Sequence, residues 1–364
     1  MITLAIFQPI GPMLANRFDL RRCLITTALI AGLLMGVTGL VTDGALLSMM
    51  RAGTGACYGL MLIFAQLSVI RITDSRNRVR GLVEVSAAIV AAGIVGPAFG
   101  GVLSDRFGVA LAFATCGGFY FIASLLSCYL PSLNMANADG HSSGGAVGIK
   151  AMLAVLKNSR VAAVIFCSAI PSRLTAAALL VVITPLYLSE LNQPATVVGR
   201  VLLLYFLAYM ITAPVAAQLS DKIGLRKPFV LFGCVCSVIA CSAVALPGMP
   251  GIALACFSLG FGQAIMGAAQ LAIVTEVLQG ASSSTAEFDA PSSEQGLATF
   301  RFLERMGSIA APFVAAAAVG VYGLRGSVIV LGAILAVGGI GLFVGLFNYH
   351  EQKITKESSD VSFA

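Results

Sequence analysis

Charged residues are scarce in this chain. Asp, Glu, Lys and Arg together make up 10% of its 364 residues, whereas soluble globular proteins carry about 25%. Hydrophobic residues account for 58%, and the mean hydropathy is +0.95. The shortage of charge excludes a water-soluble enzyme, and the abundance of apolar residues excludes a disordered chain. The composition therefore predicts a polytopic membrane protein.

The residues that commonly serve catalysis or metal binding lack the required spacing or position in this chain. The only two histidines, His141 and His350, lie in the polar segment 132–157 and in the C-terminal tail 349–364, so they are poor candidates for a proton relay. The nine cysteines lie in apolar stretches and lack the spacing of zinc ligands or of secreted disulfides. No phosphate-binding loop or nucleophile–base set is visible. We therefore expect no enzyme activity, metal or cofactor.

Uncharged runs long enough to cross a bilayer follow one another along the chain. A hydrocarbon core about 30 Å thick needs about 20 apolar residues in a helix. Prolines and glycines at 247–251 divide the run 228–275 into two helices. Ten full spans are therefore expected, in an all-α helical bundle, from these runs: 23–42, 52–70, 85–104, 107–131, 161–188, 201–220, 228–275 (two), 306–324 and 326–350.

The first fourteen residues are apolar but short. As helix they measure about 21 Å, which does not span a membrane. No basic segment precedes them and no small-residue cleavage site follows, as a signal peptide requires. We expect them to be the end of a helix whose beginning lies outside this chain.

Orientation follows from the placement of Lys and Arg. Alternate connections between spans hold 17 of the 22 basic residues, whereas the other connections hold only Arg106, Arg200 and Arg325. The basic set, and with it the tail 349–364, is predicted to be cytoplasmic. The net charge of +6 thus reports topology; a nucleic-acid partner is not expected, because that would need one clustered basic face.

The chain contains an internal repeat. Residues 14–22 align with residues 219–227 at an offset of 205, and both segments lie in short basic loops. A second alignment, at an offset of 215, places Pro97 on Pro312 and Gly108 on Gly323. Two similar halves joined by a longer linker, here 132–157, are typical of secondary transporters.

The loop repeat carries a specific resemblance. The segment Leu219-Ser220-Asp221-Lys222-Ile223-Gly224-Leu225-Arg226-Lys227 resembles the loop signature G-x-L-a-D-R-x-G-R-[KR] of the major facilitator superfamily. The first copy departs from it, with Asn16 in place of the acid and Asp19 in place of the glycine. The residues of both loops that we expect to act in conformational change are Asn16, Arg17, Asp19, Arg21, Arg22, Asp221, Lys222, Gly224, Arg226 and Lys227.

The resemblance implies twelve helices in two six-helix halves. The ten full spans then correspond to family helices 3 to 12, and the first half of the chain lacks helix 1 and most of helix 2. The implied division is an N-terminal half at 1–131, a linker at 132–157, a C-terminal half at 158–348 and a tail at 349–364.

Two further signatures occur where this numbering places them. Arg51, with Gly53, Gly55 and Ala56, resembles the Arg-x-x-x-Gly pattern of family helix 4. Gly96, Pro97, Gly100 and Gly101 resemble the Gly-Pro signature of helix 5, which is associated with drug/proton antiporters. In the family this run closes the external side in the inward-facing state. A proline and a row of glycines bend a helix and let it approach a neighbour closely, so a packing role without ligand contact is expected.

Three charged residues are candidates for binding or coupling. Arg51 and Arg173 lie within spans, where charge is costly and often functional. Arg51 could instead extend to the outer interface. Arg173, close after Pro171, needs an anionic or polar substrate or a carboxylate on another helix as its partner. Glu84 is the acid best placed at a helix mouth; no acid lies near the middle of a predicted span, so the coupling acid is Glu84, or lies outside the chain, or coupling does not use protons.

The remaining candidates are polar side chains. Near one cytoplasmic helix end, ion pairs that hold the inner side closed are expected among Arg301, Glu304 and Arg305. A fixed role in anchoring helix ends is the alternative. Uncharged polar residues that could line a cavity are Tyr58, Gln66, Tyr205, Tyr209, Gln263 and Gln270.

These features predict a monomeric secondary transporter of the cytoplasmic membrane. It would export small organic or drug-like molecules in exchange for protons, by rocking of two halves around a midplane site. One alternative is a symporter or uniporter for a nutrient such as a sugar, organic acid or peptide. Another is a chain that transports nothing: a truncated relic, half of a split gene, or a membrane scaffold.

Overall fold

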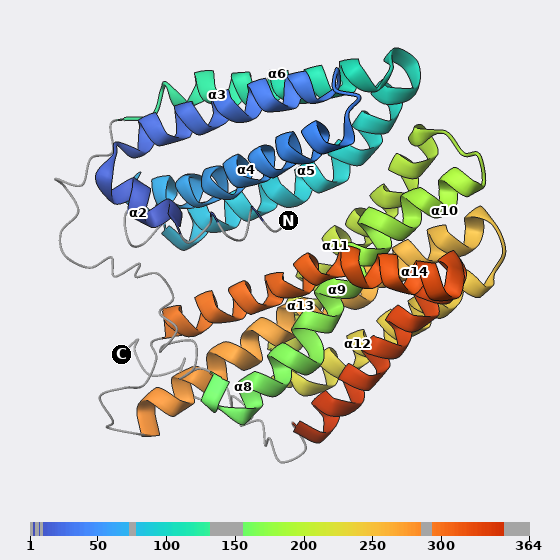
Figure 1. Cartoon of the computed structure of the whole chain (residues 1–364). Helices are drawn as coiled ribbons and strands as arrows, with labels where there is room; N and C mark the ends of the chain where they lie inside the picture. Colours follow the sequence, from blue (N-terminus) through green and yellow to red (C-terminus); the bar gives the residue numbers. More distant parts are fainter. Residues whose placement is uncertain are drawn as a thin grey trace. The chain divides into compact units, whose positions relative to one another are not determined.

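The computed structural model describes residues 3, 7, 10–72, 78–131, 156–284 and 293–345. All regular structure within these ranges is helical, and no strand occurs among them (Figure 1). The all-α fold predicted from the sequence is therefore confirmed. The linker 132–157, apart from its last two residues, and the tail 349–364 lie outside the described part of the chain.

The chain forms two compact units. The first contains Met1–Gly148 together with Tyr187–Leu203, and the second contains Ile149–Leu186 and Leu204–Ala364. Residues 187–203 follow the linker in sequence, yet they pack with the first unit. This short segment is central to the packing of helix α5, described below.

The first unit consists of long helices joined by short turns. They are α2 (Ile10–Arg17), α3 (Leu20–Thr38), α4 (Gly44–Ile72), α5 (Arg78–Phe107) and α6 (Val109–Ser127). Helix α3 packs against α4 and α6. Gly32 of α3 and Gly117 of α6 bring their backbones together, because a Cβ on Gly117 would lie only 2.8 Å from the Gly32 carbonyl oxygen.

The second unit begins with a continuous helical run over Ser159–Glu190. Its segments are α8 (Ser159–Val164), the π-helix η2 (Ile165–Ala169), α9 (Ile170–Ala177), the π-helix η3 (Ala178–Ile183) and α10 (Thr184–Glu190). The helices that follow are α11 (Ala195–Ile223), α12 (Lys227–Ser242), the 3₁₀ turn η4 (Ala243–Ala245), α13 (Met249–Ser284) and α14 (Ser293–Gly345).

Eight helical runs within the described residues are long and apolar enough to cross a membrane. The last of them, within α14, holds two of the predicted spans, since Gly323 breaks its helical geometry with φ +70° and ψ 178°. Helix α5 is not among the eight, but its 30 residues include the predicted span 85–104. In the described part of the chain, each of the ten predicted spans therefore has most of its residues on a helix.

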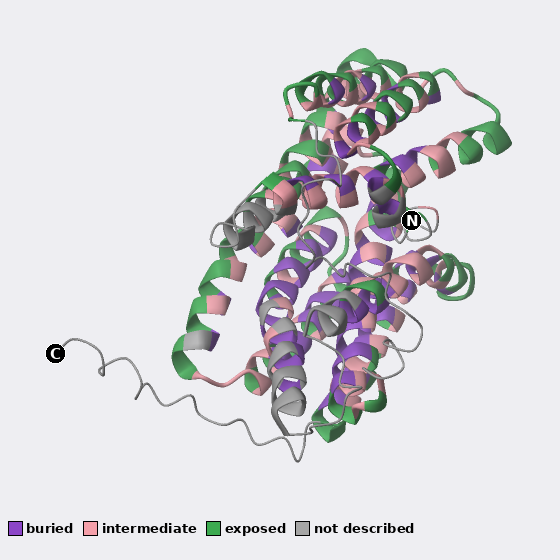
Figure 2. Cartoon of the chain, turned by 90° about the vertical axis from the view of Figure 1, so that its left-hand side faces the viewer, coloured by how far each residue is buried: buried purple, intermediate pink, exposed green. Residues whose placement is uncertain are grey.

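Burial divides most helices into an inner and an outer face (Figure 2). The outer faces carry large apolar side chains; Leu33, Val235 and Val337 are 59%, 55% and 70% exposed. Such faces are unstable in water and stable against lipid tails, which offer the same apolar surroundings as a protein core. The burial pattern fits a multi-pass membrane protein.

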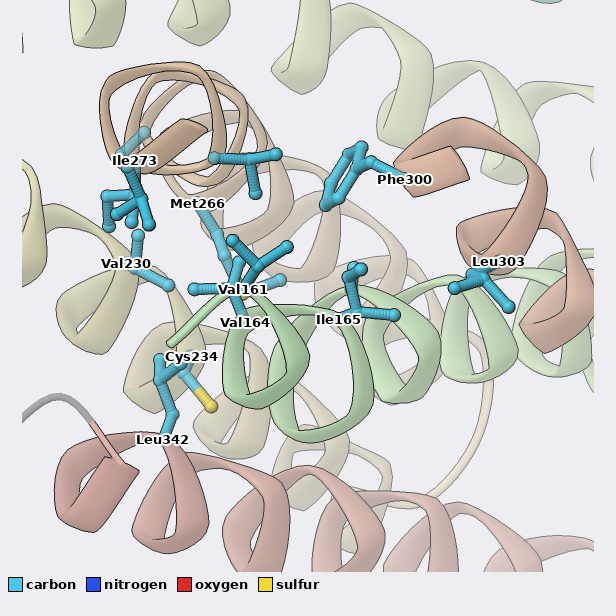
Figure 3. Close-up of a cluster of buried hydrophobic side chains, with 14 residues drawn as sticks. Val161, Val164, Ile165, Val230, Cys234, Met266, Ile273, Phe300, Leu303 and Leu342 are labelled. Atoms are coloured by element: carbon cyan, nitrogen blue, oxygen red, sulfur yellow. The ribbon is translucent and has the colours of Figure 1, made fainter. Parts of the chain in front are cut away.

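The core of the second unit joins helices from its whole length. Val161, Ile165, Val230, Met266 and Phe300 are each at most 1% exposed and belong to one cluster (Figure 3). Close crossing of α12 and α13 brings this cluster together. The crossing depends on Gly233 and Gly262, because a Cβ on Gly233 would lie 2.6 Å from the Gly262 carbonyl oxygen.

The repeated loops differ at the position where the sequence replaces glycine by aspartate. Gly224 adopts φ +70°, a conformation that glycine reaches without strain, and it ends α11. Asp19 has φ −58° and caps α3, accepting a hydrogen bond from the Arg21 amide at 3.4 Å. At the other aligned pair, Gly108 and Gly323 both have positive φ, +85° and +70°.

Candidate functional site

Arg173 lies on a helical segment with a wider, π-helical segment before it and another after it in the sequence. The π-helices η2 and η3 flank α9, which carries Pro171, Ser172 and Arg173. Proline cannot donate to the carbonyl four residues earlier, that of Cys167. Gly338 of α14 approaches this carbonyl so closely that it has no room for a Cβ. Wide helical turns of this type often occur at functional sites.

A carboxylate from α14 binds two guanidinium groups. Glu304 Oε1 accepts a hydrogen bond from Arg173 Nε at 2.6 Å, and Glu304 Oε2 accepts one from Arg301 Nη1 at 3.1 Å. The Glu304 side chain is 10% exposed, whereas that of Arg173 is 38% exposed. The cluster thus holds two positive charges and one negative charge, with part of the Arg173 surface still accessible.

Helix α13 supplies two buried amides that hold the Arg173 helix. Gln263 Nε2 donates to the Ser172 carbonyl at 2.7 Å, and Gln263 Oε1 accepts a hydrogen bond from the Tyr205 hydroxyl at 3.0 Å. Seven residues further along the helix, Gln270 Nε2 donates to Ser168 Oγ at 2.6 Å. The Tyr209 ring stacks on Tyr205. Ser172 is the immediate neighbour of Arg173, so this network fixes the backbone that carries the guanidinium.

The structure brings together more of this site than the sequence predicted. Arg173, Tyr205, Tyr209, Gln263 and Gln270 were all predicted as candidates, and all lie in this network. Glu304 was expected near a cytoplasmic helix end, with Arg301 and Arg305 as partners. The Arg301 pair is present, and Arg173 is a further partner at a shorter distance; α14 begins at Ser293, eleven residues before Glu304. Ser168 and Ser172 were missed; serines flanking a mid-span proline were the available signal.

The candidates in the first unit do not gather into a comparable cluster. The Arg51 guanidinium lies 4.6 Å from the centre of the Phe113 ring, a cation–π contact that sequence spacing did not reveal. Tyr58 is 41% exposed, Gln66 is half-buried, and Glu84 is exposed on α5. Among the described residues, no side-chain hydrogen bond joins Arg51 to Tyr58 or Gln66.

The loop residues make separate local contacts. Arg17, Asp19 and Arg22 line a cavity of about 780 Å³ at the start of α3. Arg226 donates to Ser220 Oγ at 3.0 Å, and Lys227 lies 5.7 Å from the centre of the Phe343 ring. The side chains of Asn16 and Asp221 are outside the described residues. A gating role for these loops therefore stays a prediction.

The Gly-Pro run packs against the start of α11, within the first unit. A Cβ on Gly101 would lie 2.5 Å from the Ala195 carbonyl oxygen, and Gly199 is equally close to Pro97. Gly96 and Gly100 have open space where a Cβ would stand. Only part of the predicted motif is therefore used for close helix packing.

Comparison with known protein families decides the identity of this fold. The sequence model of the Major Facilitator Superfamily matches residues 1–171 and 165–362, which is nearly the whole chain. The chain belongs to the major facilitator superfamily. The family model matches twice, and the two matches overlap at residues 165–171, just after the predicted linker at 132–157.

Two relatives of this superfamily member are named for multidrug resistance. It is 23% identical over 272 residues to the multi-drug resistance efflux pump PmrA of Streptococcus pneumoniae, covering 73% of this chain and 67% of the pump. It is 24% identical over 229 residues to the multidrug resistance protein MdtG of Dickeya zeae, covering 61% of this chain and 54% of that protein.

A solved structure supports the same fold. The chain superposes, with a TM-score of 0.72 and 14% identity, on a bacterial homolog of the human lysosomal transporter Spinster, crystallised in an inward-facing and unoccupied conformation. The match covers 94% of this chain and 87% of that one. At this identity the likeness concerns the fold alone. This member of the superfamily is thus a multi-pass membrane transporter.

Proposed function

We propose that the protein exports small organic or drug-like molecules from the cell in exchange for protons, by alternating access. The observation that carries this proposal is the buried Glu304 carboxylate, bound by Arg173 and Arg301 beside the Tyr205–Gln263 network. The relatives PmrA, a multi-drug resistance efflux pump, and MdtG, a multidrug resistance protein, favour the same class of substrate. The predicted orientation, with a cytoplasmic C-terminus, is part of the proposal.

Glu304 offers a single carboxylate to competing partners. Both of its oxygens accept hydrogen bonds from guanidinium groups, whose positive charges favour the ionised carboxylate, so departure of one of these groups favours the binding of a proton. A cationic molecule that pairs with the carboxylate would compete with the proton for the same group. Competition of this kind prevents both from being carried together, which is the requirement of antiport.

A second candidate function is supported by the accessible part of Arg173. An anionic substrate that binds this guanidinium would draw it from Glu304 and leave the carboxylate free to take a proton. Proton and substrate would then bind together, which is symport of an organic acid. The charge of the substrate therefore decides between the two functions at one site.

The test is transport in proteoliposomes that contain the purified chain. Two probes are compared with and without an imposed pH gradient: ethidium, a lipophilic cation, and a radiolabelled aromatic carboxylate. Antiport predicts that ethidium moves against the proton gradient and that collapse of the gradient stops its accumulation. Ethidium transport that is indifferent to the gradient would refute antiport, and gradient-driven co-movement of the carboxylate alone would establish the symport alternative.

A further inference from the structure

The end of α5 and the start of α11 are joined by an aspartate outside the Gly-Pro signature. Asp105 Oδ1 accepts a hydrogen bond from the Ala195 amide at 2.9 Å, and Asp105 Oδ2 accepts one from the Thr196 amide at 2.6 Å. Ninety residues separate Asp105 from Ala195 in sequence, yet both belong to the first compact unit. One carboxylate thus uses both oxygens on two adjacent amides of another helix.

The first turn of α11 cannot supply this acceptor itself. Pro194 stands in the capping position, because its carbonyl accepts hydrogen bonds from the Val197 and Val198 amides. Capping side chains such as Ser, Thr, Asp or Asn carry an oxygen that binds the first free amides of a helix, and proline has none. The free amides at Ala195 and Thr196 are therefore satisfied from α5.

The same carboxylate stands beside the closest backbone approach of the two helices. Gly101, one helical turn before Asp105, meets the Ala195 carbonyl, and Pro97, one turn earlier still, meets Gly199. Glycine contacts give shape but little strength, whereas hydrogen bonds to an ionised group are about twice as strong as neutral ones. The charge–amide contact and the glycine contacts lie along one line of packing.

We propose that Asp105 is a positioning residue of the transport cycle, a latch that fastens the first turn of α11 to the end of α5. When the two helices separate, the carboxylate leaves two backbone amides without an acceptor, so the latch favours the state in which the helices are joined. This inference concerns helix packing and does not depend on which substrate or ion is carried.

Other charged groups near the latch do not replace it. Arg106 follows Asp105 on α5, Glu190 ends α10, and Arg200 lies five residues into α11; all three are exposed. The structure gives no ion pair between any of them and Asp105 within the described residues. Hydrogen bonds from Thr196 lower the pKa of the Asp105 carboxyl, so the latch carries its charge at neutral pH.

The latch is tested by hydrogen exchange of the full-length purified protein. This measurement needs no transport, so its result is independent of the antiport proposal. In Asp105→Asn an amide NH₂ replaces one acceptor oxygen. We expect exchange to become roughly tenfold faster both in 195–203 and in 97–107. Asp43→Asn is the matched control, because Asp43 caps its own helix α4 through the Leu46 amide at 3.0 Å. That variant should exchange faster only at the start of α4.

A double variant separates a latch from a simple helix cap. Pro194→Ser gives α11 a cap of its own, so Asp105→Asn with Pro194→Ser should restore slow exchange at 195 and 196 while 97–107 stays fast. Exchange in Val230–Ser237 of the second unit checks that each variant is folded, and Asp105→Glu should recover part of the protection. The proposal is overturned if Asp105→Asn exchanges like the wild type, or if 97–107 is unchanged.

Discussion

Two arginines and one glutamate form a cluster of charges in the second unit. Arg173 and Arg301 each bind a different oxygen of Glu304, and the side chains of both arginines keep accessible surface, 38% and 54%. In a membrane, ionisable groups are stable when paired and often mark the path of substrates or protons. At the residue scale, the proposed transport mechanism therefore depends on Glu304 and on its exchange of partners.

Replacing Glu304 separates its proposed role from that of the other acid candidate. In Glu304→Gln the side chain keeps its size but cannot bind a proton, so gradient-driven accumulation of substrate should fall at least about tenfold. Exchange of substrate across the membrane without a gradient should continue. Glu84→Gln, on the exposed surface of α5, is the control and should retain coupling. Coupling that is lost in Glu84→Gln and kept in Glu304→Gln would reverse the assignment.

Asp105 gives a prediction about pH. Hydrogen bonds from Thr196 lower its pKa below the ordinary value of 3.8. A lowered pKa stabilises the joined state above pH 3.8, and this contribution is lost only as the pH falls through the lowered value. Between about pH 5 and pH 8, exchange protection of 195–203, corrected for the intrinsic rate, should therefore stay constant. A loss of protection within this range would show that another group titrates.

At the scale of elements, glycines determine which helices meet closely. The pairs Gly32–Gly117, Gly233–Gly262 and Gly199–Pro97 each remove a side chain from a crossing. The helix with Arg173 follows a different principle: it is widened by two π-helices and held by two glutamines from α13. Rigid crossings and one widened helix are suited to keep a site fixed while neighbouring helices move.

The two adjacent glycines of α5 provide a matched pair of variants. Gly101→Ala places a methyl group 2.5 Å from the Ala195 carbonyl oxygen and should destabilise the protein by about 1–3 kcal/mol. Gly100→Ala meets open space and should be neutral or slightly stabilising, because alanine favours helix. Thermal unfolding in detergent measures both. Equal unfolding temperatures for the two variants would contradict the packing described for α5 and α11.

At the scale of the whole molecule, the sequence was sufficient for the fold. Runs of uncharged residues predicted every long helix, because a bilayer demands about 20 apolar residues per span. The repeat and the loop signature predicted the superfamily, which the family match confirms. Hydropathy does not reveal the π-helices η2 and η3, because it reports the polarity of side chains and not the hydrogen-bond pattern of the backbone.

The site was predictable only in part. A mid-span arginine and glutamines within apolar helices can be recognised from the sequence, because polar groups are rare in such helices. Their partners did not, since Arg173 and Glu304 are separated by 131 positions and α14 begins earlier than the uncharged run. The role of Asp105 was also missed. Its partners are backbone amides, which every residue except proline has, so no side-chain pattern in the sequence marks the contact.

The predicted orientation can be checked on the intact protein. The tail 349–364 should be cytoplasmic, because alternate connections hold 17 of the 22 basic residues. A fluorescent protein fused after Ala364 should fluoresce, and alkaline phosphatase at the same position should be inactive. Active phosphatase at this position would show that the tail lies outside the cytoplasm and that the predicted topology is wrong.

Proton movement that accompanies the substrate tests the central claim most directly. Proteoliposomes loaded with ethidium and a lumenal pH-sensitive dye are diluted into ethidium-free buffer, so that ethidium leaves down its own gradient. Antiport through Glu304 predicts that the lumen acidifies as ethidium leaves, and that Glu304→Gln abolishes this acidification. Ethidium release by the wild-type protein without any change in lumenal pH would contradict the account.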